Sequence, residues 1–430
     1  MSEPPVRDDM REDWNRRARE DANYYAAFGR RGQDEDEFLA TGAYIVEQME
    51  AELKRLPATA NRRAWRALEI GCGPGRLMKP LSRDFGEIHG VDVSDEMAAL
   101  ARKRLAGIPW AHVHTTDGAH LAQFADESFD FVYSYAVFQH IPDCGVVAEY
   151  MREIRRVLKP GGIFRGQFNG LPGSPSHQYN TWAGCRFSAA GIRQFTRDYG
   201  FDLLELSGLD TQYLWTTWRR HKPARESSAS EPAAAVRRIT NSVSTEPAVT
   251  TSGRFSAMSL WVEGLASSCE LNGLTATVGG LEALPFYIGP PAYDGLQQLG
   301  ISLPPGSRTG LLPVLVKWQD APLLTTVVRA IPPGPPLPRV VSVTDAVNLL
   351  SDGHVSSGLV KVTTEEIGEP SQFLATVSGR GVAKVEWFLT DPVPPRCEFN
   401  FALPPGTAAG EHVLEIRYGR RRFVFSITVE

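Results

Sequence analysis

The sequence lacks several features that mark specialised classes of protein. Its 430 residues include only five cysteines and no C-x-x-C pair, which excludes a zinc ribbon and a dense disulfide framework. No apolar run approaches the roughly 18 residues that a membrane-spanning helix needs. The first residues are acidic and have no apolar core, unlike a secretory signal. We therefore expect a cytoplasmic location.

Strong charge and metal-binding clusters are also missing. The net charge of −5 gives no general attraction to nucleic acid or to an acidic membrane. No run of acidic residues suggests calcium and no set of histidines and cysteines suggests another metal, so we expect no metal site. The hydrophobic and charged fractions, 42% and 22%, are near globular averages, which excludes a wholly disordered chain.

The length and the uneven composition predict several domains. At about 100–200 residues per domain, the chain has room for two to four. Its first 220 residues alternate strand-like and helix-like patterns, whereas 18 of the 31 prolines lie in 254–430 among short apolar runs. We predict a multidomain protein, with an α/β domain that contains a mostly parallel sheet followed by two all-β sandwiches.

Five segments follow from these patterns. Residues 1–60 are expected to be helical and 61–220 to form the α/β domain, with its last two strands antiparallel because too few residues join them for a crossover helix. Residues 221–253 are rich in Ser, Ala, Thr, Pro and charge, and are expected to be a flexible linker. The two β-sandwiches are expected at 254–333 and 337–430.

An internal repeat supports two similar β modules. Leu303-Pro304-Pro305-Gly306 recurs 100 residues later as Leu403-Pro404-Pro405-Gly406, and each copy is followed by a glycine and two strand-like runs. That offset fits modules of immunoglobulin size. The proline-rich stretch at 332–336 between them is expected to be a stiff spacer.

A glycine-rich turn at the end of the first predicted strand carries the chemistry. Glycines let the backbone approach a ligand, and the helix that follows offers free N–H groups. A dinucleotide fingerprint needs glycine where Arg76 stands, and a Walker A loop needs Gly-Lys-Ser/Thr, so both are excluded. The turn reads Leu68-Glu69-Ile70-Gly71-Cys72-Gly73-Pro74-Gly75-Arg76.

At these residues the sequence resembles the class I S-adenosylmethionine-dependent methyltransferases, in particular their small-molecule (type 11) branch. Ordered motifs over about residues 60–220 carry the resemblance: Glu69-x-Gly71-x-Gly73-x-Gly75, Gly90-Val91-Asp92-Val93-Ser94, Thr116-Asp117-Gly118, Gln139-His140-Ile141 and Lys159-Pro160-Gly161-Gly162. The cofactor motifs show no departure from the family pattern. The resemblance implies a Rossmann-like domain with a seven-stranded sheet, a helical lid at 1–60, and S-adenosylmethionine as cofactor.

The resemblance also implies which residues bind the cofactor. The glycines would pack against its methionine part, Asp92 would bind both ribose hydroxyls, and the segment around Asp117 would read the adenine. A carboxylate suits the ribose because it accepts two hydrogen bonds from a diol. The full set of candidates is Tyr25, Glu69, Gly71, Cys72, Gly73, Gly75, Asp92, Val93, Asp117, Gly118, Ser134 and Tyr135.

Structural alternatives stay open for several of these residues. The glycines also suit an ordinary turn, and Asp92 suits a helix cap or turn. At Asp117 the backbone of its neighbours would serve as well as the side chain. Cys72 is expected to be a small buried residue and no nucleophile, because nothing near it in sequence lowers its pKa.

Methyl transfer from a sulfonium is an in-line displacement, so the protein mainly aligns the nucleophile and at times removes a proton. His140 is the candidate general base, with an imidazole that only orders its loop as the alternative. Tyr24 and Tyr25 of the expected lid either touch the ligands or pack the lid. The loop at 169–182, with His177, Tyr179 and Trp182, is a candidate lining of the acceptor site.

The segment after the fourth strand bears on the acceptor. It has Ser134-Tyr135-Ala136-Val137 instead of the Asn/Asp-Pro-Pro-Tyr/Phe signature of base and amide N-methyltransferases. We therefore expect O- or C-methylation of a small molecule, a lipid or a sugar, and no nucleic-acid partner.

The β modules loosely resemble bacterial IPT/TIG-like immunoglobulin modules, through Val262-x-Gly264 and Val278-Gly279-Gly280 among others. They are expected to bind a glycan or a partner protein, or else to act as spacers. Trp318, Trp387 and Tyr418 would form an exposed platform or lie in the core. The competing hypothesis for the whole chain is a cofactor-binding scaffold without turnover.

Overall fold

The computed structural model describes residues 6–27, 31–57, 61–172, 180–221, 234–253, 255–335, 337–347, 351–367, 369–383, 385–391 and 396–430. These residues form two compact units. One contains the chain up to Arg19 together with Gly42–Pro333, and the other contains Glu20–Thr41 together with Gly334–Glu430. None of the described helices is long and apolar enough to cross a membrane.

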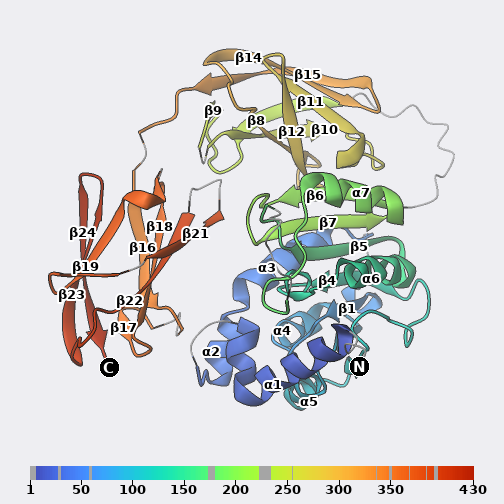
Figure 1. Cartoon of the computed structure of the whole chain (residues 1–430). Helices are drawn as coiled ribbons and strands as arrows, with labels where there is room; N and C mark the ends of the chain where they lie inside the picture. The colour runs from blue at the N-terminus through green and yellow to red at the C-terminus, as the bar shows by residue number, and fades with distance from the viewer. Residues whose placement is uncertain are drawn as a thin grey trace. The chain divides into compact units, whose positions relative to one another are not determined.

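The first unit contains the predicted α/β domain, with seven strands in the order β3-β2-β1-β4-β5-β7-β6 (Figure 1). Strands β3, β2, β1, β4 and β5 pair in parallel, and β7 pairs antiparallel with both β5 and β6. The mostly parallel Rossmann-like sheet and the antiparallel final pair are thereby confirmed. The strands are β1 (Arg66–Ile70), β2 (Glu87–Asp92), β3 (Ala111–Thr115), β4 (Phe129–Ser134), β5 (Leu158–Phe168), β6 (Phe201–Ser207) and β7 (Leu214–Arg220).

Helices cover both faces of this sheet, so its central strands are apolar on both sides. Leu68 of β1 belongs to one core cluster with α6 and α7, whereas Ala67 belongs to a second cluster with α3, α4 and α5. Ser94 caps α5 and Ser188 caps α7, each through a hydroxyl that accepts a backbone N–H. The helices are α3 (Ala43–Glu52), α4 (Met78–Leu81), α5 (Asp95–Leu105), α6 (Cys144–Val157) and α7 (Ala189–Tyr199), with 3-10 turns η1 (Leu53–Arg55), η2 (Arg62–Ala64), η3 (Ser82–Asp84) and η4 (Phe138–His140).

The segment expected to be a helical lid at 1–60 is divided between the two units. Helix α1 (Val6–Ala27) is broken at Asp21, whose φ and ψ of −165° and 90° are extended. The part of α1 up to Arg19 belongs to the first unit, and Glu20–Thr41, with α2 (Glu35–Ala40), to the second. Tyr24 and Tyr25 therefore lie in the unit that does not hold the cofactor motifs.

The first β module starts earlier than the sequence predicted. Strands β8 (Ala235–Asn241) and β9 (Ala248–Thr250) fall inside the expected linker 221–253, of which 222–233 lie outside the described residues. β8 pairs antiparallel with β10, and β9 pairs in parallel with β15. Inter-strand hydrogen bonds and the burial of Asn241 and Val249 outweigh the polar composition, which had suggested a flexible segment. The linker prediction is therefore wrong for these two strands.

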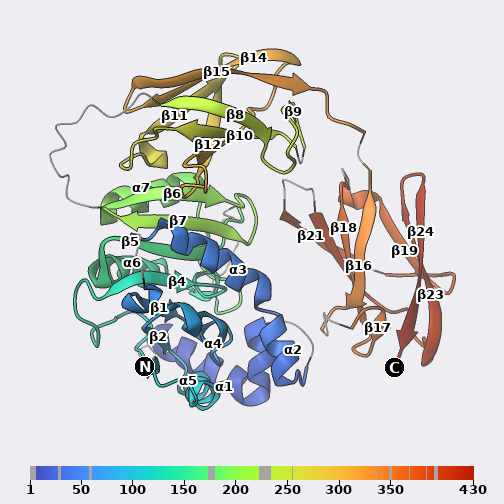
Figure 2. The same ribbon diagram turned by 180° about the vertical axis from the view of Figure 1, so that it is seen from behind.

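This module continues the edge of the α/β sheet (Figures 1 and 2), and the two share one hydrophobic core cluster. β12 meets β6 at the pair Tyr287–Glu205. The guanidinium of Arg193 on α7 donates to Leu271 O and to Asn272 Oδ1. The remaining elements are β10 (Ala257–Glu263), η5 (Leu271–Gly273), β11 (Leu274–Val278), β12 (Leu281–Ile288), β13 (Gln297–Ser302), β14 (Gly310–Trp318) and β15 (Ala321–Ile331).

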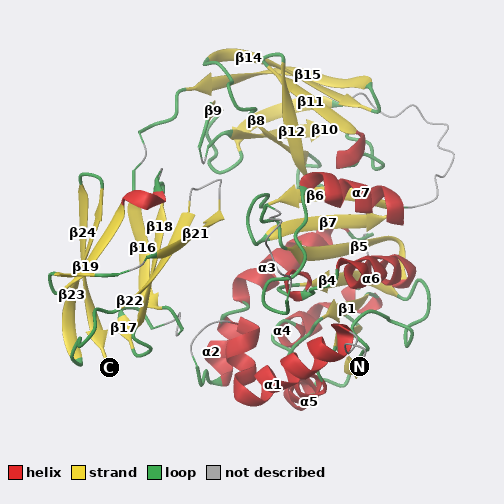
Figure 3. Cartoon of the chain, in the orientation of Figure 1, coloured by secondary structure: helices red, strands yellow, loops and turns green. Residues whose placement is uncertain are grey.

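The second β module belongs to the other unit and consists of two sheets, β16-β18-β22-β21 and β17-β24-β23-β19-β20. The colouring in Figure 3 shows that this module is built mainly of strands. Phe373 and Phe399 stack between the sheets with ring centroids 3.9 Å apart. Its elements are β16 (Arg339–Asp345), β17 (His354–Val355), β18 (Leu359–Glu365), η6 (Pro370–Gln372), β19 (Phe373–Val377), β20 (Arg380–Gly381), β21 (Glu386–Asp391), β22 (Arg396–Ala402), β23 (Gly410–Tyr418) and β24 (Arg421–Val429).

The predicted repeat is visible in both modules. The hairpins β14–β15 and β23–β24 each follow the repeated Leu-Pro-Pro-Gly sequence, and each starts on a glycine, Gly310 or Gly410, with φ of 121° or 127°. Side chains rarely adopt this backbone conformation, which is why glycine stands at both positions.

Candidate functional site

The glycine-rich turn lies directly after β1, as predicted. Gly71, Gly73 and Gly75 have φ of 68°, 50° and 83°, in the left-handed region that favours glycine. A Cβ on Gly71 would lie 2.3 Å from Val137 Cγ2, so no larger residue fits there. The turn is held in place by Val91 O, which accepts from the backbone N–H groups of Gly71 and Cys72.

Asp92 ends β2 beside this turn. Its Oδ2 accepts from Gly73 N at 2.8 Å and its Oδ1 from Ser94 N at 2.9 Å. Burial raises the pKa of Asp92 to about 6 although these backbone donors oppose the shift. Asp92 thus holds the turn in place, which is the structural alternative given for it in the sequence analysis. Each of its oxygens retains a second lone pair for a ligand.

Glu69 is the second buried carboxyl group near the turn. Its Oε2 accepts from the Tyr133 hydroxyl at 2.9 Å, and only 3% of the residue is exposed. Burial raises the pKa of Glu69 to about 8, while the nearby Arg76 charge lowers it. Buried carboxyl groups of this kind favour a cationic ligand, because a positive charge offsets the cost of ionising them.

Asp117 and Gly118 follow β3. The Asp117 carboxylate accepts from the backbone N–H groups of Ala119 and His120 and pairs with the His120 ring. These contacts outweigh burial and lower the pKa of Asp117 to about 2. The side chain therefore stabilises its own turn, which favours the alternative that neighbouring backbone reads the ligand. Gly118, with φ of 90°, lies beside Met10 and Val93.

Ser134 and Tyr135 end β4. The Ser134 hydroxyl is buried and donates to Ile70 O at 2.9 Å, which ties β4 to β1. Tyr135 stacks on Trp215 with centroids 5.6 Å apart, and the Arg76 guanidinium lies 5.6 Å from the Tyr135 ring. Cys72 is buried and its thiol pKa is raised by burial, in line with the expected small core residue.

Two residues of α1 that the sequence motifs did not indicate contact the segments that follow β2 and β3. Arg11 donates to Thr116 O at 2.9 Å, and Asn15 Oδ1 accepts from the Ser94 hydroxyl at 2.7 Å. Tyr25, which was expected here, donates to Glu20 within the second unit. Only the helical spacing of α1 was visible in the sequence, and spacing does not reveal which side chains reach another strand.

His140 lies in η4, after β4. Its Nδ1 contacts Trp182 O at 3.1 Å, and its Nε2 contacts Gln139 Nε2 at the same distance. A carbonyl partner requires N–H at Nδ1, so Nε2 accepts from the Gln139 amide. Burial, together with the charge of Arg17, lowers the pKa of His140 to about 4. The imidazole is therefore neutral at pH 7 and a weak base.

Arg17 of α1 contacts two tryptophan rings. Its guanidinium lies 4.6 Å from the ring centroid of Trp14 and 5.0 Å from that of Trp182, and it pairs with Asp13 at 2.8 Å. Trp182 was a candidate lining residue, and the structure brings it to His140. His177 and Tyr179, the other two candidates of that loop, lie outside the described residues.

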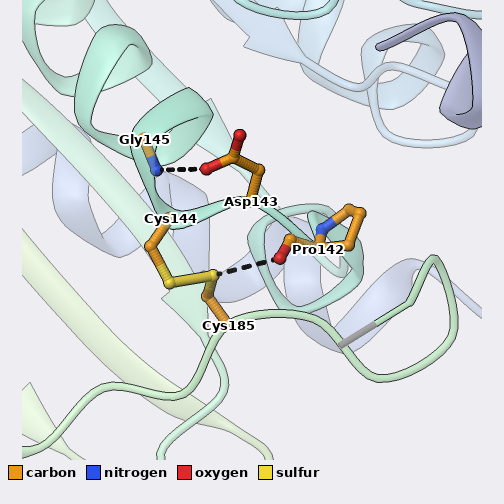
Figure 4. Close-up of a disulfide and its surroundings, with 5 residues drawn as sticks. All are labelled: Pro142, Asp143, Cys144, Gly145 and Cys185. Atoms are coloured by element: carbon orange, nitrogen blue, oxygen red, sulfur yellow. Dashed lines mark hydrogen bonds between the residues drawn. A yellow bond between two sulfur atoms is a disulfide. The ribbon is translucent and has the colours of Figure 1, made fainter. Parts of the chain in front are cut away.

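A disulfide joins the start of α6 to the loop that contains Trp182 (Figure 4). Cys144, in the first turn of α6, is bonded to Cys185, and their Cα atoms are 5.7 Å apart. Cys185 N also donates to Ile141 O, and Gly184 N donates to Gln139 O. The sequence did not reveal this pair, because 41 residues separate the two cysteines and nothing local marks them as partners.

Comparisons with known proteins bear on this site. Residues 68–165 match a family model described as a methyltransferase domain. Phosphoethanolamine N-methyltransferase 2 of Caenorhabditis elegans is 38% identical over 97 residues, 22% of this chain and 22% of that protein. A ubiquinone biosynthesis O-methyltransferase of Cereibacter sphaeroides is 28% identical over 212 residues, 45% of this chain and 83% of that protein.

Among solved structures, geranyl diphosphate C-methyltransferase of Streptomyces coelicolor A3(2) aligns with 16% identity and a TM-score of 0.39, over 51% of this chain and 99% of that chain. The chain spans 28% and 22% of the length of the first two curated relatives it matches. The match over residues 68–165 supports the predicted methyltransferase domain and, with it, S-adenosylmethionine as the cofactor.

Proposed function

We propose that this protein is an enzyme that transfers the methyl group of S-adenosylmethionine to a small-molecule acceptor. The observation that carries the proposal is the turn after β1, where positive-φ glycines and two buried carboxyl groups, Glu69 and Asp92, surround the place for the cofactor. When bound, S-adenosylmethionine supplies the methyl group and a thioether leaving group.

The residues present fit such a cofactor. The glycines of the turn have positive φ and place no side chain between its backbone and a ligand. Glu69 and Asp92 have the acceptor chemistry for the cationic and diol parts of the molecule. We propose that Glu69, Gly71, Gly73, Gly75 and Asp92 hold the cofactor, with α1 as a cover.

On the acceptor side we propose that His140 orders the loops around the acceptor. Its Nδ1–H donates to Trp182 O and its Nε2 accepts from the Gln139 amide, and a pKa of about 4 matches poorly the pKa near 7 that suits a general base. The in-line displacement then depends mainly on alignment by His140, Trp182 and the loops that the disulfide joins.

For the acceptor we propose O- or C-methylation of a small molecule, a lipid or a sugar. The ubiquinone biosynthesis O-methyltransferase, of which the chain covers 83%, supports a hydroxyl acceptor. The matches include N-, O- and C-methyltransferases, which differ in the methylated atom. The signature missing after β4 is that of base and amide N-methyltransferases, so its absence argues against those two acceptors and not against an amine.

We also propose that the two β modules are immunoglobulin-like binding modules, the first extended to start near Ala235, and that the protein is cytoplasmic. The repeated hairpins support the common origin of the modules. The competing proposal, a cofactor-binding scaffold, is favoured by the large share of the chain in these modules.

Calorimetry with S-adenosylmethionine tests the binding step. The unmutated protein is expected to bind, and Asp92→Ala to bind at least about tenfold more weakly through loss of hydrogen bonds to a charged acceptor. Absence of binding by the unmutated protein would overturn both proposals. Release of S-adenosylhomocysteine with members of an acceptor library separates the enzyme from the scaffold.

A further inference from the structure

A cavity outside the cofactor site lies between α3 with η1 and the first β module. Its volume is about 480 Å³, within the range of about 300–1,000 Å³ typical of small-molecule sites. Its lining includes Trp261 of β10, Tyr287 of β12, Gln298 of β13, and Pro291 and Tyr293 of the loop between β12 and β13. Lys54 of η1 completes the wall.

The lining combines aromatic rings with neutral and cationic hydrogen-bonding groups. None of the described residues along it has a carboxylate, an imidazole or a thiol, so the cavity is suited to binding and not to catalysis. Tyr293 is fully exposed, at 109% of its reference area, although it belongs to a β module with a well-formed core. An exposed tyrosine beside a cavity offers a ring face to a ligand.

Two of these side chains are held in fixed orientations. Trp261 Nε1 donates to Thr240 Oγ1 at 3.1 Å, and the Arg238 guanidinium lies 4.4 Å from the Trp261 ring centroid. The Gln298 amide donates to Ser259 Oγ at 2.6 Å, which fixes its plane. Because these groups are already ordered, a ligand would lose little free energy in arranging them.

We propose that this cavity binds a sugar residue of a glycan. A pyranose has an apolar C–H face and a rim of hydroxyl groups, which match the Trp261 and Tyr293 rings and the Gln298 and Lys54 side chains. A lipid chain has no hydroxyl groups to pair with the Gln298 amide oxygen or the Lys54 ammonium, whereas a pyranose has several. A proline-rich peptide would also stack on aromatic rings, and the experiment below distinguishes it from a sugar.

The glycan site is next to the methyltransferase domain. Lys54 directly follows α3, whose Val46 and Met49 pack in the same core cluster as Cys72 of the glycine turn. A bound glycan would therefore be anchored to the same unit that holds the cofactor motifs. This inference does not depend on methyl transfer. For the first β module it selects a glycan from the three roles that the sequence left open, a glycan site, a partner-protein site and a spacer, and gives the glycan a place.

A glycan array probed with the full-length protein, followed by calorimetry on the glycans retained, tests the proposal. Tyr293→Ala and Trp261→Ala are expected to weaken binding of the retained glycan at least about tenfold, as for aromatic residues central to an interface. The control Tyr44→Ala removes an exposed tyrosine of α3 that does not line the cavity, and should change the affinity by less than about twofold.

Tyr293→Ala is the decisive variant, because removal of so exposed a ring leaves the core intact. Retention of no glycan on the array would overturn the proposal, as would equal affinity of both cavity variants and the unmutated protein. Tyr293-dependent binding of a decaproline peptide without any glycan would overturn it in favour of a peptide site. Affinity for S-adenosylmethionine, measured on the same samples, reports separately on the proposed enzyme function.

Discussion

At the scale of single residues, the proposed cofactor site depends on positions where no other side chain fits or where a carboxyl group is buried. Gly71 is the clearest case, because positive φ and contact with Val137 both exclude a side chain. Glu69 and Asp92 are the buried charges, and burial raises the pKa of both. These features lead to two predictions.

The first prediction concerns Gly71→Ala. A Cβ at 2.3 Å from Val137 Cγ2, on a backbone with φ of 68°, should destabilise the first unit by about 1–3 kcal/mol and abolish cofactor binding. Thermal unfolding and calorimetry check both effects. Gly107→Ala is the matched control, since nothing lies within 4 Å of its added Cβ and its φ is not positive. Equal behaviour of the two variants would contradict the steric argument.

The second prediction concerns pH. With a pKa of about 8, Glu69 is mainly protonated in the ligand-free protein at pH 7, and a cationic cofactor favours its ionised form. Binding then releases a proton, so affinity for S-adenosylmethionine should rise between pH 6 and about 8 by at most about tenfold per pH unit, and level off above. Calorimetry in buffers of different ionisation enthalpy counts the protons.

The same shift affects stability with the opposite sign. Because the folded pKa of Glu69 exceeds its unfolded value near 4.5, the ligand-free protein should lose stability as pH rises from about 4.5 to 8. Glu69→Gln should remove the pH dependence of the affinity and the loss of stability between about pH 6 and 8, whereas the raised pKa of Asp92 leaves a loss of stability between about pH 4 and 6. A cofactor affinity that is constant from pH 6 to 9 in the unmutated protein would argue against this role of Glu69.

At the scale of elements, the proposed acceptor side depends on two loops from different parts of the chain. The segment 139–142 follows β4, and residues 180–185 follow β5. Backbone hydrogen bonds from Gly184 and Cys185 and the Cys144–Cys185 disulfide join them (Figure 4). His140 and Trp182 are brought together by this pairing.

The third prediction is that the disulfide organises the acceptor side and not the cofactor side. The double variant Cys144→Ser, Cys185→Ser should lose about 2–4 kcal/mol of stability and show a raised KM for the acceptor, with unchanged affinity for S-adenosylmethionine. Unfolding, acceptor kinetics and calorimetry check the three expectations. The buried Cys269→Ser serves as a thiol control outside these loops.

The redox state of Cys144 and Cys185 in cells also tests the proposed cytoplasmic location. Cytoplasmic proteins rarely keep disulfides, because the glutathione pool reduces them. Alkylation of free thiols in freshly lysed cells, followed by mass spectrometry of Cys144 and Cys185, reports the bond. A fully oxidised pair would count against the cytoplasm, and a reduced pair would agree with it.

At the scale of the whole molecule, the α/β domain and the first β module form one cooperative unit. They share a core cluster, and the Arg193 guanidinium on α7 donates to Leu271 O and Asn272 Oδ1 across the boundary. Removal of the β module would therefore expose apolar surface of the enzyme domain. The boundary between the two compact units lies after Pro333, and not between the α/β domain and the first β module.

The fourth prediction follows from this arrangement. Calorimetric unfolding should show one transition for the first unit and a separate one for the second. Arg193→Ala should lower the free energy of unfolding of the first unit by about 1–3 kcal/mol, because it leaves buried carbonyl groups without a donor. The transition of the second unit should stay unchanged. Arg197→Ala, on the exposed side of α7, should change neither. A single transition for the whole chain would contradict the division.

By itself the sequence determined the local features. The glycine-rich turn after the first strand, the strand pattern of residues 61–220 and the 100-residue repeat all depend on neighbours along the chain, so residue types and spacing were sufficient to predict them. Only the tertiary structure decided the contacts between distant segments: Asn15 on Ser94, Cys144 on Cys185, β8 and β9 within the expected linker, and Arg193 on the first β module. Such contacts depend on the packing of elements far apart in the chain, and packing leaves no periodic trace in the sequence.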